Sequence, residues 1–397
     1  MKIATAYSTD TDVETACSKA YTSLRDKLDS TPNLLFLAWS VTYPGETLVR
    51  LLGDTAPGVK IHGASTCLGG MTEDGFISDD GRGLTMLGIY DPDGGYGVGA
   101  AVIGDSAREA ASQAVLAALD DADRPGELPA LVWLSATPGA EESVISGIED
   151  VIGEDVPIIG GSAADNTVEG HWLLAANRQT GADQVVVSVL FPSVETAFAF
   201  HSGYNPTETR GRVTRAEGRT LYAIDGRPAA EVYDEWTGGA LGGAADGGGN
   251  VLASTTLFPL GRVVGDVGGV PYYRLSHPDG VTADGALSLF SDINEGDEVV
   301  LMQGSVETLV SRAGRVAESA LSAGRLTKEQ ISGAMVIYCA GCMLTVQSDM
   351  PRVVDSLATA LGRAPFLGTF TFGEQGCFVG GENRHGNLMI SVVVFGA

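Results

Sequence analysis

Cysteine is scarce in this chain, with five residues among 397: Cys17, Cys67, Cys339, Cys342 and Cys377. An odd number in a large chain argues against a disulfide scaffold, and the first residues, MKIATAYSTDTD, show no secretory pattern. Long apolar runs are also missing, since none approaches the roughly 18 residues that span a bilayer. We therefore expect a cytoplasmic protein whose fold needs no disulfide.

Basic residues are few as well. Lysine and arginine together number 24, five of them lysine, against 50 acidic residues. The resulting net charge of −26 repels phosphate backbones and anionic lipid, so nucleic acid and membrane surfaces are poor partners. The acidity fits either a salt-rich habitat or simple solubility. A hydrophobic fraction of 44% and a charged fraction of 19% describe an ordinary globular chain, and the length favours two or three domains.

Phosphate-binding loops are missing although glycine is abundant. The richest cluster, GGALGGAADGGGN (238–250), contains neither G-x-x-x-x-G-K-[ST] nor a G-x-G-x-x-G that opens a helix after a strand. We interpret this segment as a flexible loop.

What the chain does have is a unit of strand, helix, strand, helix and strand that occurs three times. Each copy ends in a turn rich in Gly, Ser or Thr, followed by another apolar run at 84–89, 185–191 or 388–395. The first copy comprises 3–7, 12–28, 34–39, 46–52 and 59–61, with its turn from Gly63. The second comprises 98–103, 106–119, 131–134, 141–152 and 156–159, with its turn from Gly160. The third comprises 298–302, 306–321, 335–338, 349–361 and 365–367, with its turn from Gly368.

These elements rest on periodicity. The strands are short runs of Val, Ile and Leu, as expected of strands covered on both faces, and the helices carry apolar stripes at helical spacing. The repeat predicts an α/β fold in which strand–helix–strand–helix–strand units form mixed and parallel sheets. Ligands of such sheets bind beyond the carboxyl ends of the strands, where the three turns lie.

A segment of different texture, 207–297, separates the second copy from the third. It holds the turn Asp225-Gly226, a short helix at 229–236 and strand-like runs that end before NEGD (294–297). We predict a β-rich insert belonging to the third copy. The expected domains are therefore 1–206, with two units, and 207–397, with the insert and the third unit.

Several motifs together resemble the FIST family (F-box and intracellular signal transduction). GASTCLGG is similar to the family's Gly-Cys-Ser-Thr-x-Gly-Glu turn, with Ser65 and Thr66 matching and Leu68-Gly69 in place of Gly-Glu. IIGGSAAD (158–165) resembles the second family turn, and VTRAEGRTLYAIDGRPAAEVY resembles the start of the C-terminal domain.

The C-terminal motifs resemble the same family. YCAGC (338–342) is similar to its Cys-x-Gly-Arg segment, with Cys342 where arginine is usual, and GTFTFGEQG (368–376) is similar to its Gly-x-x-Thr-x-Gly-Glu turn. His385 resembles the His of a His-Asn pair, although Gly386 follows it. The resemblance implies two FIST domains that form a sensory, ligand-binding module for signal transduction, such as is often attached to bacterial signalling domains.

The expected ligand is a small polar or anionic metabolite, such as an amino acid, with no cofactor. Output would pass through a separate signalling protein or through self-association. The candidate ligand-binding residues are those of the three turns and their neighbours: Ser65, Thr66, Gly160, Gly161, Ser162, Asp165, Cys339, Gly341, Cys342, Thr371, Gly373, Glu374 and His385. The C-terminal members should form the principal site. Thr66 and Thr371 each follow a repeat glycine by three residues, so we expect them at equivalent places.

Other chemistry remains open. Cys339-x-x-Cys342 has the spacing of a redox pair or of half a zinc site, which Cys377 and His385 would complete, although the pair begins at a buried strand. A thiol with His385 and an orienting Glu374 has the residue types of acyl transfer, so the alternative function is a cysteine-dependent enzyme of acyl transfer or thiol redox.

The remaining candidates have simpler interpretations. Four histidines lack a partner motif and are expected in turns or at the surface: His62, His171, His201 and His277. Glu141 and Glu142 are interpreted as acids in the first turn of a helix, where the helix dipole favours them.

Overall fold

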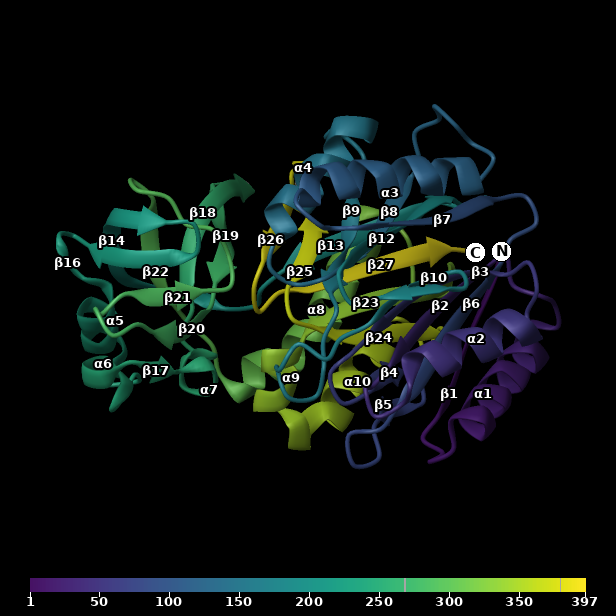
Figure 1. Ribbon diagram of the computed structural model, residues 1–397, viewed down its shortest axis with the longest axis horizontal. Coiled ribbons are helices and arrows are strands. Elements are labelled where there is room, and N and C mark those ends of the chain that lie inside the picture. The colour runs from purple at the N-terminus through teal and green to yellow at the C-terminus, as the bar shows by residue number, and fades with distance from the viewer. Residues whose placement is uncertain (268, 379) are drawn as a thin grey trace.

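The computed structural model describes residues 1–267, 269–378 and 380–397. Three six-stranded sheets form a body, and a fourth, nine-stranded sheet forms a separate lobe beside it (Figure 1). The fold class predicted from the repeat, mixed α/β with repeated units, is confirmed.

Each of the three units follows the order strand, helix, strand, helix, strand, hairpin and closing strand. Unit 1 comprises β1 (Lys2–Ser8), α1 (Val13–Leu28), β2 (Leu34–Trp39), α2 (Gly45–Thr55), β3 (Lys60–Ser65), β4 (Gly70–Thr72), β5 (Gly75–Ile77) and β6 (Leu84–Tyr90). Unit 2 comprises β7 (Gly95–Val102), α3 (Ala107–Asp121), β8 (Leu131–Ala136), α4 (Glu141–Ile152), β9 (Ile158–Ser162), β10 (Leu174–Ala176), β11 (Gln179–Gly181) and β12 (Gln184–Phe191).

Unit 3 repeats this order with additions. It comprises β13 (Thr196–His201), α8 (Val306–Ala323), β23 (Ile331–Cys339), α9 (Ala340–Thr345), a 3-10 turn (Gln347–Asp349), α10 (Met350–Ala360), β24 (Phe366–Thr371), β25 (Glu374–Cys377), β26 (Asn383–Gly386) and β27 (Ile390–Gly396). The helices begin where the sequence allows a cap. The carboxylate of Asp12 accepts the N–H of Thr15 at 2.8 Å before α1, and Ser305 and Thr308 form a capping box before α8.

The three sheets share one strand order. They read β1-β6-β2-β3-β10-β11, β7-β12-β8-β9-β25-β26 and β13-β27-β23-β24-β4-β5. The pairs β2–β3, β8–β9 and β23–β24 are parallel, and the flanking pairs are antiparallel. Each sheet ends in a hairpin from another unit: unit 2 supplies sheet 1, unit 3 supplies sheet 2, and unit 1 supplies sheet 3. The units are therefore interlocked in a ring.

The three six-stranded sheets are each covered on both faces, as the apolar strands predicted. The inner faces meet in one core that includes Phe36, Trp133 and Ile337 from sheets 1, 2 and 3. The outer faces are covered by helices: α1 and α2 on sheet 1, α3 and α4 on sheet 2, and α8 and α10 on sheet 3. The residues at the carboxyl ends of the parallel strands, Ser65, Ser162 and Thr371, are buried.

The predicted first strand of the third unit is wrong. The run at 298–302 becomes β22 (Glu298–Gln303), which pairs with β14 and β18 in the nine-stranded sheet. Its place in sheet 3 is taken by β13, which pairs with β27 over six positions, from Thr196 opposite Phe395 to His201 opposite Ile390. The insert therefore interrupts unit 3 between β13 and α8, rather than preceding it.

The insert has its own core and its own elements. They are β14 (Asn205–Glu217), β15 (Thr220–Ile224), β16 (Arg227–Pro228), α5 (Ala229–Thr237), α6 (Ala244–Gly247), β17 (Gly249–Asn250), α7 (Leu252–Thr255), β18 (Leu260–Val267), β19 (Val270–Ser276), β20 (Pro278–Val281), β21 (Leu287–Leu289) and β22. The predicted β-rich texture, the turn at Asp225-Gly226 and the short helix are confirmed. The domain division at 206/207 stays a prediction.

The described ranges contain no helix with both the length and the apolar character that a membrane crossing requires. All five cysteines are free and buried.

Candidate functional site

The three parallel strand pairs end at equivalent residues. Ser65 lies opposite Trp39, Ser162 opposite Ala136, and Thr371 opposite Cys339. The hydroxyl equivalent to Thr371 is therefore that of Ser65, and the predicted equivalence with Thr66 is wrong by one position.

The prediction counted positions from the glycine that opens each turn, and these glycines are not at equivalent positions. Gly63 lies opposite Leu37, whereas the matching position in unit 3 is Thr369, opposite Ile337. Thr66 has a different role, because its Oγ1 donates to the carbonyl of Phe370 at 3.0 Å and accepts the N–H of Phe370 at 2.7 Å. This side chain joins unit 1 to unit 3.

Ser65, Gly161, Ser162 and Thr371 line a central cavity of about 30 Å³ among the three sheets. The remaining wall is largely apolar. A space of this size holds little more than a water molecule. The four predicted residues are thus brought together, at a place too small for a metabolite.

His62 also faces the central cavity. It is buried, with Nδ1 at 2.8 Å from Ser188 Oγ and Nε2 at 2.9 Å from Ser135 Oγ. Burial lowers the pKa of His62 to about 3. The prediction that the four unassigned histidines are turn or surface residues is wrong for His62 and His277, which are buried, and right for His171 and His201, which are exposed.

Gly160 and Asp165 have structural roles in the second turn. A Cβ on Gly160 would lie 1.9 Å from the carbonyl oxygen of Leu134, so only glycine fits. The buried Asp165 carboxylate accepts N–H groups from Thr167, Val168, Glu169 and His171. Burial opposes its ionisation, but these backbone hydrogen bonds, led by that of His171, lower the pKa of Asp165.

A second cavity, of about 40 Å³, lies at the carboxyl ends of β23 and β24, and we name it the C-terminal cavity. Five predicted residues line it: Cys339, Gly341, Thr371, Gly373 and Glu374. The rest of its wall comes from the loop after β9, the insert, α9, the turn between β24 and β25, and the segment before β27: Val168, Leu252, His277, Phe290, Leu344, Phe372, Asn387 and Leu388. The chain thus places the C-terminal motifs around one cavity.

Glu374 is the acidic group of this cavity and is fully buried. Its Oε1 accepts the hydroxyl of Thr371 at 3.0 Å, and its Oε2 accepts the N–H of Met389 at 2.9 Å. Burial raises the pKa of Glu374 well above its usual range, and a negative charge on Cys342 raises it further. This shift favours the neutral carboxylic acid, which can donate a hydrogen bond.

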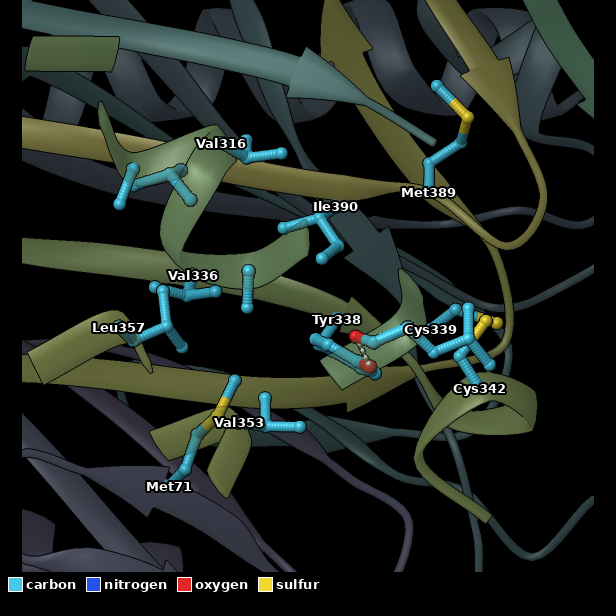
Figure 2. Packing of buried hydrophobic residues seen from close by; sticks show 14 of the residues in the cluster. Met71, Val316, Val336, Tyr338, Cys339, Cys342, Val353, Leu357, Met389 and Ile390 are labelled. Atoms are coloured by element: carbon cyan, nitrogen blue, oxygen red, sulfur yellow. Dashed lines mark hydrogen bonds between the residues drawn. The ribbon is translucent and has the colours of Figure 1, made fainter. Parts of the chain in front are cut away.

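Cys342 lies next to the cavity wall, fully buried against Cys339 (Figure 2). Its Sγ is 3.5 Å from the Tyr204 hydroxyl. Burial would raise the pKa of Cys342, but the hydrogen bond with Cys339 and the charge of Arg312 lower it to about 6. Burial and the neighbouring Cys342 sulfur raise the pKa of Cys339 well above its usual range. The opposite shifts favour one thiolate, at Cys342, beside one thiol, at Cys339.

Arg312 on α8 is the fully buried cation beside this pair, and sequence reasoning missed it. Its Nη1 donates to the carbonyls of Ser202 at 2.5 Å and Leu388 at 2.7 Å, and its guanidinium lies 5.0 Å from the ring centroid of Tyr338. No Asp or Glu in the described part of the chain forms an ion pair with it. The sequence did indicate that Arg312 is buried, because it lies between Leu309 and Ala313 on the apolar stripe of the predicted helix.

His385 lies behind Gly373 and beside the first turn of α4. Its Nδ1 is 3.2 Å from the carbonyl oxygen of Glu374, and its Nε2 is 3.2 Å from that of Phe290. Within the described ranges, neither thiol is among its hydrogen-bond partners, so a Cys–His nucleophile pair is not assembled.

Glu141 and Glu142 do more than favour the helix dipole. Arg219 of the insert bonds to them at 2.6 Å and 2.8 Å, and Ser162 donates to Glu141 at 2.7 Å. Their carboxylates lie within 4.8 Å of a ring nitrogen of His385, a donor set of the kind that binds divalent metals. Arg219 forms ion pairs with both carboxylates. Among described residues, Cys339, Cys342, Cys377 and His385 do not form a metal-ligating group of three.

An uncharacterized protein from Methanocaldococcus jannaschii is 29% identical over 183 residues, which is 41% of this chain and 33% of that protein, so the chain spans about a third of this relative. Among solved structures, the cyanuric acid hydrolase from A. caulinodans aligns over 100% of this chain and 99% of its own, with 9% identity and a TM-score of 0.40. PurLQS from Thermotoga maritima aligns over 99% and 72%, with 9% identity and a TM-score of 0.24. Identities of 9% and TM-scores below 0.5 do not establish a shared function.

Family models give the decisive match. The FIST N domain matches residues 33–227, and the FIST C domain matches residues 229–377. Because the two matches follow one another over most of its length, the chain belongs to the FIST family.

Proposed function

We propose that this protein is a cytoplasmic sensory module that binds a small polar or anionic metabolite, such as an amino acid, in the C-terminal cavity. FIST domains are associated with signal-transduction sensing. The observation that carries the proposal is the cavity itself: a partly open, mostly apolar space lined by Thr371, Glu374 and Asn387. An apolar wall with a few convergent polar groups is typical of small-ligand sites.

The charge of the cavity supports a polar or anionic ligand. Burial raises the pKa of Glu374 and so favours its neutral form, which does not repel an anion and can donate a hydrogen bond to it. One peptide unit links this carboxyl to the buried cation, because Arg312 donates to the carbonyl of Leu388 and the N–H of Met389 donates to Glu374. The dipole of that peptide unit carries the positive field of Arg312 toward the cavity.

The size of the cavity supports a sensing role. An amino acid is much larger than about 40 Å³, so binding requires the cavity to widen. The insert supplies Leu252, His277 and Phe290 to the wall, and two short segments, 202–204 and 304–305, join it to the body. Ligand binding would therefore move the insert lobe. We propose that a separate signalling protein, or a second copy of the chain, reads this movement.

The test is a thermal-shift titration with amino acids and small carboxylates. The unchanged protein should show a saturable rise in Tm for its ligand. Glu374→Gln and Thr371→Val each remove a buried hydrogen bond and should weaken binding about tenfold. Glu382→Gln, at the exposed turn of the same β25–β26 hairpin, is the matched control and should respond like the unchanged protein. A full ligand response in both cavity variants would place the site elsewhere.

The alternative of acyl transfer has less support. His385 contacts backbone carbonyls rather than a thiol, and Glu374 contacts Thr371 and Met389 rather than a histidine. A general base for Cys339 or Cys342 is therefore not positioned.

A further inference from the structure

The two cysteines at the end of β23 are arranged for bonding to each other. Cys339 is the last residue of β23 and caps α9, and Cys342 is the third residue of that helix. The two side chains lie side by side at the start of α9 (Figure 2), and both are buried. A disulfide between residues placed in this way needs side-chain rotation and a small adjustment of one helical turn.

Charge compensation sets the state of this pair. The groups that face Cys342 are Arg312 on α8, Tyr204 after β13, Tyr338 and Cys339 on β23, and Glu374 on β25. Arg312 is their only cation, and its Nε and Nη2 have no hydrogen-bond partner other than this cluster. An uncompensated buried guanidinium is costly. The Cys342 thiolate is therefore the anion that balances Arg312.

The two sulfurs differ in access. Cys339 lines the C-terminal cavity, whereas Cys342 lies behind it without exposed surface. A small molecule in the cavity meets Cys339 first. Cys342 is placed to react only with a group already attached to Cys339.

We propose that Cys339 and Cys342 form a reversible dithiol–disulfide couple that low-molecular-weight disulfides oxidise through the C-terminal cavity. Cys339 passes its proton to Cys342 and attacks one sulfur of R–S–S–R, which gives Cys339–S–S–R and releases RS⁻. The proton on Cys342 passes to this thiolate, giving RSH. The Cys342 thiolate then attacks the Cys339 sulfur, forms the Cys339–Cys342 disulfide and releases the second RS⁻. Two electrons and one proton leave the pair, and the small disulfide gains them.

Oxidation changes the charge of the cavity. The disulfide removes the anion next to Arg312, and the nearest group that can replace it is Glu374, linked to Arg312 through the peptide unit of Leu388 and Met389. The negative charge therefore moves from behind the cavity wall to its surface. Because the reduced form has the better charge compensation, this couple is more readily reduced than a structural disulfide.

The experiment equilibrates the folded full-length protein with reduced and oxidised glutathione at a series of ratios. Intact mass spectrometry and differential alkylation then locate the products. The unchanged protein should lose two hydrogen atoms reversibly. Cys377→Ser is the matched control, since Cys377 is also buried at a strand end, and it should behave identically. Cys342→Ser should accumulate glutathione on Cys339, and Cys339→Ser should accumulate none. Oxidation of the pair only after unfolding, or glutathione on Cys342 instead, would overturn the proposal.

A gentler variant keeps the test decisive if Cys342→Ser fails to fold. Tyr204→Phe leaves both thiols in place and removes a hydroxyl that lies 3.5 Å from the Cys342 sulfur and 2.8 Å from the carbonyl oxygen of Thr256. The reduced form should lose stability, so half-oxidation should require about fivefold less oxidant. An unchanged midpoint would contradict the charged pair. The proposal shares its cavity with the proposed ligand site but needs no ligand. Failure here leaves the thermal-shift response of the reduced protein intact, and failure of that response leaves the redox result intact.

Discussion

At the scale of single residues, buried polar side chains decide where the units meet. His62 on β3 contacts Ser135 on β8 and Ser188 on β12, which joins sheet 1 to sheet 2 inside an apolar core. A neutral imidazole satisfies both contacts with one donor and one acceptor. An imidazolium there would be a buried charge whose two hydrogen-bond partners are hydroxyls rather than carboxylates. Protonation of His62 therefore opposes folding.

This arrangement predicts a loss of stability in mild acid. The pKa of His62 is about 3 in the folded state, against an ordinary 6.5, so the unfolded chain takes up the proton first as the pH falls. The contribution is complete above about pH 6.5 and declines toward pH 3, with a loss of about 2 kcal/mol between about pH 7 and about pH 5. Urea denaturation of the unchanged protein and of His62→Gln at these two pH values measures it.

His62→Gln should be less stable at neutral pH and should lose less stability in acid. The control is His171→Gln, because His171 is exposed. His277, whose pKa burial lowers to about 4, supplies the remaining histidine dependence in the variant. Equal pH dependence in the unchanged protein and in His62→Gln would refute the assignment.

Residue types predicted from the sequence were more accurate than their roles. Cys339, Gly341, Thr371, Gly373 and Glu374 surround one cavity because their motifs follow neighbouring parallel strands, and sequence order fixes that proximity. The sequence could not supply the ionic partner, since helix α8 lies far from these motifs along the chain. The sequence did indicate a buried cation, because Arg312 lies on the apolar stripe of that helix.

At the scale of elements, glycine sets how closely a helix lies against a strand. The β7 strand passes directly under α3, whose inner face is largely alanine, including Ala114 and Ala118. A Cβ on Gly99 would lie 2.2 Å from the carbonyl oxygen of Ala114, and one on Gly97 would lie 2.0 Å from that of Ala118. Backbone carbonyls cannot rotate away as a side chain can, so the helix itself must shift.

Gly99→Ala should therefore destabilise the fold by about 3 kcal/mol, the upper part of the range for overpacking. Gly243→Ala is the matched control, because a Cβ there meets no atom within 4 Å. Its effect on the free energy of unfolding should stay within about 0.5 kcal/mol. Chemical denaturation of the two variants side by side decides the matter, and equal stabilities would mean that α3 can move without cost.

The positions of the strands and helices along the chain were predicted well, but the neighbours of several strands within the sheets were not. Local periodicity identified β22 correctly as a strand but assigned it to sheet 3, while β13, hidden in the run before the insert, holds that place. The exchange of the β4–β5, β10–β11 and β25–β26 hairpins was also missed. Both errors have one cause: the spacing of apolar residues specifies how a strand is buried and carries no information about which strand lies beside it.

At the scale of the whole molecule, the exchanged hairpins make the three units one structure. Removing any unit would leave one sheet without its outer hairpin and would expose the core shared by all three sheets. The insert differs, because it has a core of its own and only two short segments join it covalently to the body, although Leu275, Val300 and Met302 also pack against unit 3. The covalent order of the chain thus suggests two domains in series, whereas the contacts form a ring with a lobe attached.

This topology predicts two levels of stability in native-state hydrogen exchange. The amides of β2, β8 and β23, one central strand from each sheet, should exchange through the same global opening, with one common free energy and one common dependence on denaturant. The insert strands should open at a lower free energy, because their unfolding leaves the ring intact. Gly99→Ala, which strains sheet 2 alone, should lower the value for all three central strands equally. A decrease confined to β8 would show that the units unfold independently and that the exchanged hairpins do not couple them.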